Sequence, residues 1–135
     1  MVTRAFIAAS SPLAYRFMVG SGLGRKMREG LYRVAFHNVH GAGNGVMYVR
    51  GGKMRGGNSV CAFIGSYTEA DEVVSVKVST RLHTADPNFK SLFNGGEVTI
   101  VLKGKVQDDA VDLAGSALHM PGVTFKAMLT MIEAD

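Results

Sequence analysis

The sequence predicts an all-β fold, an eight-stranded antiparallel up-and-down β-barrel with one short helical loop. Short runs of alternating apolar and polar residues follow one another from Gly30 to the end, as expected of half-buried strands. Glycine is frequent, with 17 residues against 3 prolines, which indicates many tight turns. The runs recur roughly every 10–14 residues, a spacing typical of sandwiches and barrels. Because the strands are joined in sequence by short turns, we expect them to close into a small barrel without exposed edges.

The chain divides into eight expected strands joined by polar or glycine-rich turns. We expect strands at residues 30–38, 45–50, 53–55, 60–68, 72–83, 97–106, 110–119 and 123–132. The stretch HGAGNG, residues 40–45, is expected to be the first turn. Gly51 and Gly52 are expected to form a type I′ hairpin turn, because that turn needs positive φ at both central positions. QDD and MPG are expected to be the turns before the last two strands.

The longest irregular connection runs from His83 to Gly96 and contains the expected helical turn. Asp86-Pro87 is a favourable helix start, and Asn94-Gly95 is a favourable stop. Phenylalanine and leucine side chains give this loop an apolar side. We therefore expect it to fold back over one end of the sheet.

The charges separate the chain into an extension, residues 1–27, and a barrel domain, residues 28–135. Residues 1–29 hold five basic residues and one acidic residue, which gives +4, the net charge of the whole chain. Residues 30–135 then hold ten of each sign and have no net charge. We interpret the extension as flexible, or as a wrongly assigned start, since Met27 could itself begin the chain. The folded part has no electrostatic footprint for nucleic acid, so direct nucleic-acid binding is not expected.

The cysteine count and hydropathy indicate the compartment. Cys61 is the only cysteine, which excludes an internal disulfide and favours a reducing, cytoplasmic location. The sequence has no run of 18 apolar residues, so no membrane span is expected.

The stretch RGGKMRGGNS, Arg50 to Ser59, resembles an RNA-binding segment because it holds two Arg-Gly-Gly triplets. Such RNA-binding segments are disordered and repeated, whereas this stretch lies between alternating strands. We interpret Gly51-Gly52 as the hairpin turn. We interpret Gly56-Gly57 as a bulge or bend where backbones approach closely.

The candidate catalytic and metal-binding residues do not form a convincing site. His37 and His40 could share a metal with Glu69 or Asp86, but no spacing places three ligands on one face. Cys61 lies in an apolar strand pattern, where a small buried hydrophobe is the default. Paired carboxylates fall in predicted turns, and the glycine-rich GSGLGRK is not part of a βαβ unit. We therefore expect no catalytic residue, no metal and no cofactor.

The stretch TEADE places three carboxylates within four residues at a predicted hairpin tip. An ordinary acidic turn explains this pattern, but a compact negative surface also steers a basic partner. A DNA-binding regulator is one such partner, because its own surface must be positive. The candidate partner-binding residues are Glu69, Asp71 and Glu72.

The predicted barrel interior is a second candidate site. An eight-stranded barrel is either just filled by its side chains or able to hold one small ligand. The 8 methionines fit both alternatives, since methionine fills irregular cores and also lines adaptable cavities. The candidate lining residues of an apolar cavity are Tyr32, Val34, Phe36, Tyr48, Phe125 and Met131. The alternative function is therefore a carrier of an apolar small molecule or lipid.

Residues 28–135 resemble the GrlR-like proteins, small bacterial negative regulators of type III secretion. The resemblance rests on GLYRVAF, on GGKMRGGNS leading into FIGSYT, and on the acidic turn EADE. It continues in TRLH, in GGEVTIVLKG and in the final PGVTFKAMLTMI. The order and spacing of these stretches carry the likeness, because none is specific alone.

The resemblance implies a lipocalin-like barrel, a homodimer and a function without catalysis. It implies that the protein binds a helix-turn-helix transcriptional activator and keeps it from its promoter. The acidic turn of the family, implicated in that contact, falls here on Glu69, Ala70, Asp71 and Glu72. Ala70 interrupts the run of carboxylates, so one charge of the family pattern is missing.

Overall fold

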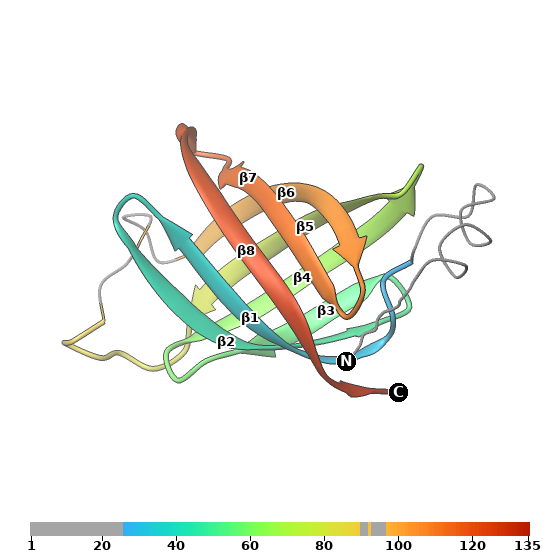
Figure 1. The fold of residues 1–135 in the computed structure, drawn as a ribbon. Helices are drawn as coiled ribbons and strands as arrows, with labels where there is room; N and C mark the ends of the chain where they lie inside the picture. Colours follow the sequence, from blue (N-terminus) through green and yellow to red (C-terminus); the bar gives the residue numbers. More distant parts are fainter. Residues whose placement is uncertain (1–25, 90–91, 93–96) are drawn as a thin grey trace.

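The computed structural model describes residues 26–89, 92 and 97–135 and forms a closed antiparallel barrel from them (Figure 1). Each strand is hydrogen-bonded to the next in chain order, and the last strand returns to pair with the first. The strands are β1 (Gly30–Asn38), β2 (Gly41–Arg50), β3 (Lys53–Gly57), β4 (Cys61–Ala70), β5 (Val73–Leu82), β6 (Glu97–Gln107), β7 (Ala110–Ala117) and β8 (Met120–Ala134). The predicted eight-stranded up-and-down barrel is confirmed.

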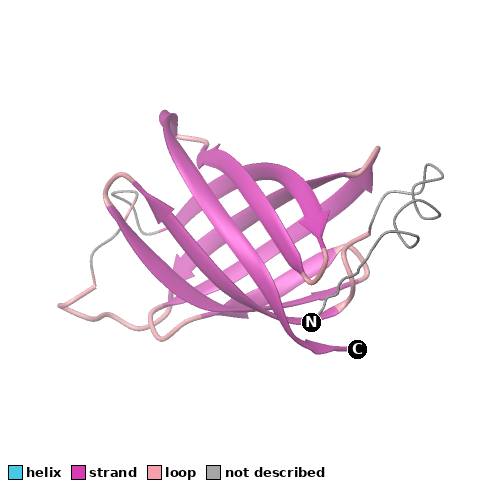
Figure 2. Cartoon of the chain, in the orientation of Figure 1, coloured by secondary structure: helices cyan, strands magenta, loops and turns pink. Residues whose placement is uncertain are grey.

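The connection between β5 and β6 holds no helix in its described residues (Figure 2). The Phe89 N–H donates to the Asp86 carbonyl at 2.9 Å, which closes a single turn. The Asp86 carboxylate also accepts the Asn88 N–H at 2.9 Å. This side-chain bond has the geometry of an N-cap, but only the single turn follows it in the described residues, so no helix extends from Asp86-Pro87. The expected stop at Asn94-Gly95 lies outside the described residues.

Alternation of inward and outward side chains along the strands builds the core inside the barrel. Tyr32 and Val34 of β1 are buried, as are Val74, Val76 and Val78 of β5. These faces were predicted from the period of two. Neighbouring strands contribute aliphatic side chains to the same interior, so one continuous apolar cluster fills the barrel.

The second strand begins earlier than the sequence suggests. HGAGNG was expected to be a turn, but β2 already starts at Gly41 and pairs with β1 along its whole length. The Phe36 ring covers Gly43, where a Cβ atom would lie 2.7 Å from it. The Phe63 ring likewise covers Gly45, at 2.8 Å. These glycines leave room for aromatic rings inside a strand, a use that turn statistics do not reveal.

The two Gly-Gly pairs have different roles. Gly51 and Gly52 have φ of 57° and 80°, so both central positions of the β2–β3 turn are left-handed, as predicted. Gly56 and Gly57 stay in register with both neighbouring strands, so the expected bulge is absent there. A Cβ atom at Gly56 would lie 2.0 Å from the Val46 carbonyl oxygen. The predicted close backbone approach is thus confirmed.

The meander order places unlike residues at the two ends of the barrel. One end carries the turns after β2, β4 and β6, the start of β1 and the end of β8. Within two residues of these turns and chain ends lie eight of the 11 acidic residues: Glu29, Glu69, Asp71, Glu72, Asp108, Asp109, Glu133 and Asp135. We call this end the acidic end. The opposite end holds all 4 histidines, His37, His40, His83 and His119.

A candidate partner-binding end of the barrel

The β4–β5 turn presents two carboxylates to solvent at the acidic end. Asp71 and Glu72 occupy its two central positions with φ of 53° and 69°, and both are exposed. Left-handed backbone costs an ordinary L-residue roughly 1–2 kcal/mol, and only Gly, Asn and Asp adopt it routinely. The backbone at Glu72 is therefore strained, and this strained position presents an exposed negative charge. We call Asp71 and Glu72 the acidic tip.

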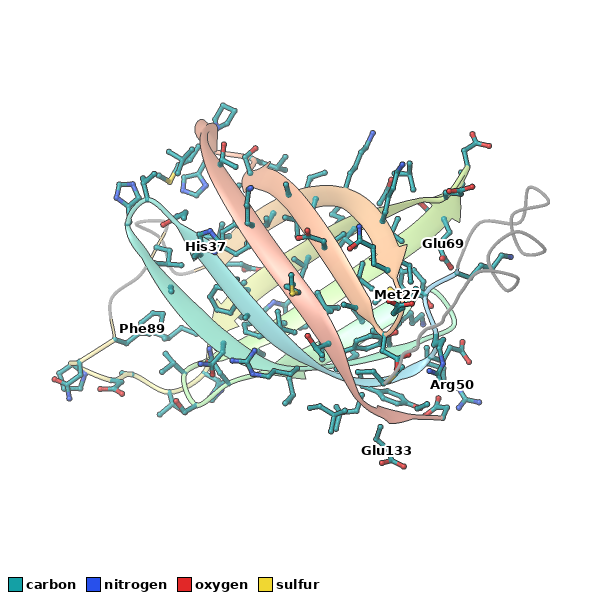
Figure 3. The ribbon with its side chains drawn as sticks, viewed as in Figure 1. Met27, His37, Arg50, Glu69, Phe89 and Glu133 are labelled. Atoms are coloured by element: carbon teal, nitrogen blue, oxygen red, sulfur yellow. The ribbon has the colours of Figure 1, made fainter. Side chains whose placement is uncertain are left out.

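Glu69 differs from the other two predicted partner-binding residues. It is half-buried at the end of β4, and its Oε2 accepts the backbone N–H of Met27 at 2.7 Å. Figure 3 shows Met27 and Glu69 near the same end of the barrel. The three carboxylates therefore do not form one solvated group. Two are free in solvent, and one holds the chain that precedes β1.

Residues 26–29, which we call the strap, cross the acidic end and bond to several strands. The Tyr32 hydroxyl donates to the Arg28 carbonyl at 2.6 Å. The Gly51 N–H donates to Glu29 Oε2 at 2.8 Å. The Asp135 N–H donates to the Glu29 carbonyl at 3.1 Å. The strap is thus tied to β1, to the β2–β3 turn and to the end of β8.

Met27 anchors the strap. Its side chain is only 4% exposed and belongs to the apolar cluster. Burying a methionine contributes about 1.5–3 kcal/mol. Although the sequence assigns Met27 to the extension, the structure includes it in the core. The packed part of the described chain therefore begins no later than this residue.

Arg28 adds a charged contact to the strap. Its Nη1 lies 2.6 Å from Asp109 Oδ1 in the β6–β7 turn. Both side chains are more than half exposed, at 56% and 60%. An exposed ion pair contributes only about 0.2–1 kcal/mol. Arg28 therefore orients the strap more than it stabilises it.

Tyr32 is the buried residue of β1 whose hydroxyl contacts the strap. Its side chain is 2% exposed, and burial raises the pKa of its hydroxyl to about 12. The nearby Arg28 charge opposes this rise, and Asp109 adds to it. The hydroxyl is therefore a neutral donor to the strap carbonyl at all physiological pH values.

The barrel interior contains an apolar cavity of about 60 Å³. Three of the six predicted lining residues, Val34, Phe36 and Phe125, line it. Phe36 and Phe125 have ring centroids 5.7 Å apart, so the two rings pack against each other inside the barrel. Ligand pockets commonly measure about 300–1,000 Å³, so this interior is nearly filled by its own side chains.

The other three predicted lining residues lie elsewhere. Tyr32 is buried but lies outside the cavity lining, and Met131 packs against the edge of the core. Tyr48 was placed wrongly, because the inward residues of β2 are Met47 and Val49. By alternation Tyr48 points outward, where its hydroxyl donates to Asp135 Oδ2 at 2.7 Å.

The outer face of β8, β1 and β2 carries exposed apolar side chains. Val46 and Tyr48 of β2 are 44% and 38% exposed. Met128 and Ile132 of β8 are 45% and 52% exposed. The two strands flank β1 on either side, and exposed Arg33 of β1, which pairs with Val46 and Thr130, lies between the two apolar groups.

The residues weighed for catalysis or metal binding stay apart. Among the described residues, no group of three or more histidine, cysteine or acidic side chains could hold a metal ion. The His83 ring nitrogens lie 2.6 Å from Thr84 Oγ1 and 3.0 Å from the Asn58 carbonyl. Cys61 is half-buried, and burial raises the pKa of its thiol, which makes the thiol a poorer nucleophile.

Sequence reasoning missed the strap, Asp109 and the collection of acids at one end. Asp108-Asp109 was interpreted as an ordinary turn, and its place at the same end as the acidic tip follows only from strand order. The signal was available, since alternate turns of a meander lie at the same end. Assigning each charge to an end would have shown the asymmetry.

Comparison with known proteins adds no assignment. No protein-family model matches the chain, and no curated protein matches it. The part of the chain that the structure describes contains no long apolar helix of the kind that spans a bilayer.

Proposed function

We propose that this protein is a non-catalytic regulator that binds a basic protein partner through its acidic end. The observation that carries the proposal is the charge asymmetry of the barrel. Eight acidic residues gather at this end. Three basic residues meet the same criterion, Arg28, Arg50 and Lys53, and Lys26 precedes them, so the described residues give this end a net charge of −4. A charged surface of one sign steers an oppositely charged partner and raises its association rate.

The acidic tip is the first contact in this proposal. Asp71 and Glu72 lie outside the ion pairs found between described residues, so a partner would not have to break one to reach them. Their left-handed backbone also supports a functional use, because glycine or asparagine would occupy the same turn with less strain.

The partner class that fits is a helix-turn-helix transcriptional activator. Its DNA-binding surface is positive, so an acidic end competes with DNA for the same residues. The resemblance to GrlR-like negative regulators supports this choice, with the acidic turn of that family falling on Glu69, Ala70, Asp71 and Glu72. Because Glu69 is engaged by the strap, Asp71 and Glu72 supply most of the available charge.

A pull-down from native lysate tests the proposal. Wild type is compared with Asp71→Ala/Glu72→Ala and with a matched control, Glu97→Ala/Asp112→Ala. The control removes two exposed carboxylates that lie outside the acidic end. A basic DNA-binding protein captured by wild type and control but not by the tip variant supports the proposal. Equal capture by all three proteins contradicts it.

An apolar carrier is the second candidate, because every residue lining the interior cavity except Thr80 is apolar. The cavity of about 60 Å³ admits only a very small ligand unless the side chains move. Met47 and Met54 line it and are the most adaptable groups there. Native mass spectrometry of gently purified protein tests this candidate, and a ligand-free barrel argues against it.

Homodimerisation belongs to the same proposal. The exposed apolar face formed by Val46, Tyr48, Met128 and Ile132 supports it, since such faces mark interaction sites. This face lies on β8, β1 and β2, which the closed strand order places across the barrel from β4 and β5, so a dimer would leave the acidic tip open to the partner.

A further inference from the structure

We infer that the strap occupies a peptide-binding site at the acidic end, formed by Glu69, Tyr32 and Asp109. We call this site the seat. A segment of the partner that has an apolar residue followed by arginine replaces the strap in the seat. The inference rests on the proposed function, since it names what the partner presents. It follows from how the barrel holds Met27 and Arg28, and from which of these contacts another chain could reproduce.

Two contacts of the seat are made to backbone atoms, so they do not depend on the side chains of the bound segment. Glu69 Oε2 accepts the Met27 N–H at 2.7 Å, and the Tyr32 hydroxyl donates to the Arg28 carbonyl at 2.6 Å. Any peptide offers an N–H and a carbonyl at this spacing. These two contacts therefore fix the position of a bound segment and accept a foreign chain as readily as the strap.

Two side-chain positions supply the selectivity. The first is the apolar position that buries Met27 to 4% exposure, and it would reject a charged residue. The second is Asp109, which lies 2.6 Å from Arg28 and would accept arginine or lysine. An apolar residue followed by a cation is the chemistry that fits both.

The electrostatics favour exchange over permanent closure. The described residues of the acidic end, with the strap counted, carry a net charge of −4, which attracts a second basic segment. The Arg28–Asp109 pair is exposed and easily screened. Release of the strap frees Glu69 and Asp109, which the incoming segment of the partner then contacts. Partner binding and strap release would therefore reinforce each other.

The experiment uses full-length protein and a labelled peptide of residues 25–31, RKMREGL, followed by fluorescence anisotropy. In wild type the strap competes for the seat, which lowers the apparent affinity by the fraction of molecules with an empty seat. The variant Met27→Ser/Arg28→Ala weakens the strap and leaves the seat intact. We expect it to bind the peptide about tenfold or more tighter than wild type.

Two controls keep the result specific. Arg28→Ala alone retains the buried methionine, folds without a core change and should bind with intermediate affinity. Adding Asp109→Lys to the double variant should abolish the gain, as should a peptide carrying Met27→Asp. If the double variant gains no affinity, or if Asp109→Lys leaves the gain unchanged, the seat does not exist.

The outcome is separable from that of the proposed function. The peptide assay needs no partner, whereas the pull-down with Asp71→Ala/Glu72→Ala needs no strap exchange. A lost partner with no peptide binding leaves the regulator proposal standing and overturns the seat. Peptide binding with an unchanged pull-down keeps the seat and removes the acidic tip from partner recognition.

Discussion

The Glu69 carboxylate holds the backbone N–H of Met27 at 2.7 Å across 42 residues of sequence. This bond joins the hairpin that carries the acidic tip to the strap that closes the same end. A surface charge predicted to be free in solvent is therefore a structural acceptor, and the acidic end is one connected unit.

Replacing Glu69 tests that bond through stability. Glu69→Ala leaves a partly buried N–H unpaired, and we expect a loss of about 1–2 kcal/mol in the free energy of unfolding. Glu69→Gln keeps an acceptor oxygen and should lose much less. Urea unfolding measures both variants, with Asp112→Ala as the control, because Asp112 is exposed and forms no ion pair with a described residue. Equal losses for all three would show that the hydrogen bond contributes nothing.

A substitution at Gly45 of β2 tests why the predicted turn HGAGNG forms a strand. In Gly45→Ala the new Cβ atom would lie 2.6 Å from the Gly57 carbonyl oxygen and 2.8 Å from the Phe63 ring. We expect a loss of about 1–3 kcal/mol, as for overpacking. Gly122→Ala is the matched control, because a Cβ atom there meets nothing within 4 Å. Thermal unfolding compares the two, and equal melting temperatures would refute the close packing.

Tyr32 predicts an alkaline limit to stability. Burial raises the pKa of its hydroxyl to about 12 in the folded state, above the ordinary value of 10.0. Its contribution is therefore complete below pH 10 and is lost as the pH rises through 12. Absorbance titration of the phenols should show a late component that diminishes in Tyr32→Phe, while burial also raises the pKa of Tyr67, which remains. A wild-type curve that matches Tyr32→Phe apart from one ordinary phenol would contradict this burial.

The apolar outer face predicts the oligomeric state. Val46→Lys/Met128→Lys places charges on two exposed positions flanking β1, so the fold should remain. Light scattering after size exclusion should give a dimer for wild type and a monomer for the variant. Val101→Lys, on the outer side of β6, is the control, being exposed at 37% away from this face. A dimer in all three proteins would place the interface elsewhere.

The barrel could be predicted from the sequence, but the contacts at its two ends could not. Alternation and turn residues predicted eight strands in meander order. The two-residue hydrophobic period and the turn-forming residues are local properties of the chain, so they can be read without knowing the tertiary contacts. HGAGNG was misjudged because Phe36 and Phe63, which cover its glycines, lie on other strands. Tyr48 was assigned to the interior because composition favours burying an aromatic ring, while register decides its direction. Glu69 looked solvated because its partner Met27 is distant in sequence.

The central claim is that the acidic end binds a basic partner, and affinity measured with the captured partner tests it most directly. Biolayer interferometry at two salt concentrations compares wild type, Asp71→Ala/Glu72→Ala and Glu97→Ala/Asp112→Ala. We expect the tip variant to bind about tenfold more weakly at low salt, mainly through slower association, and to depend less on salt concentration than wild type. The control should match wild type. Equal affinity and equal salt dependence in all three proteins would contradict the claim.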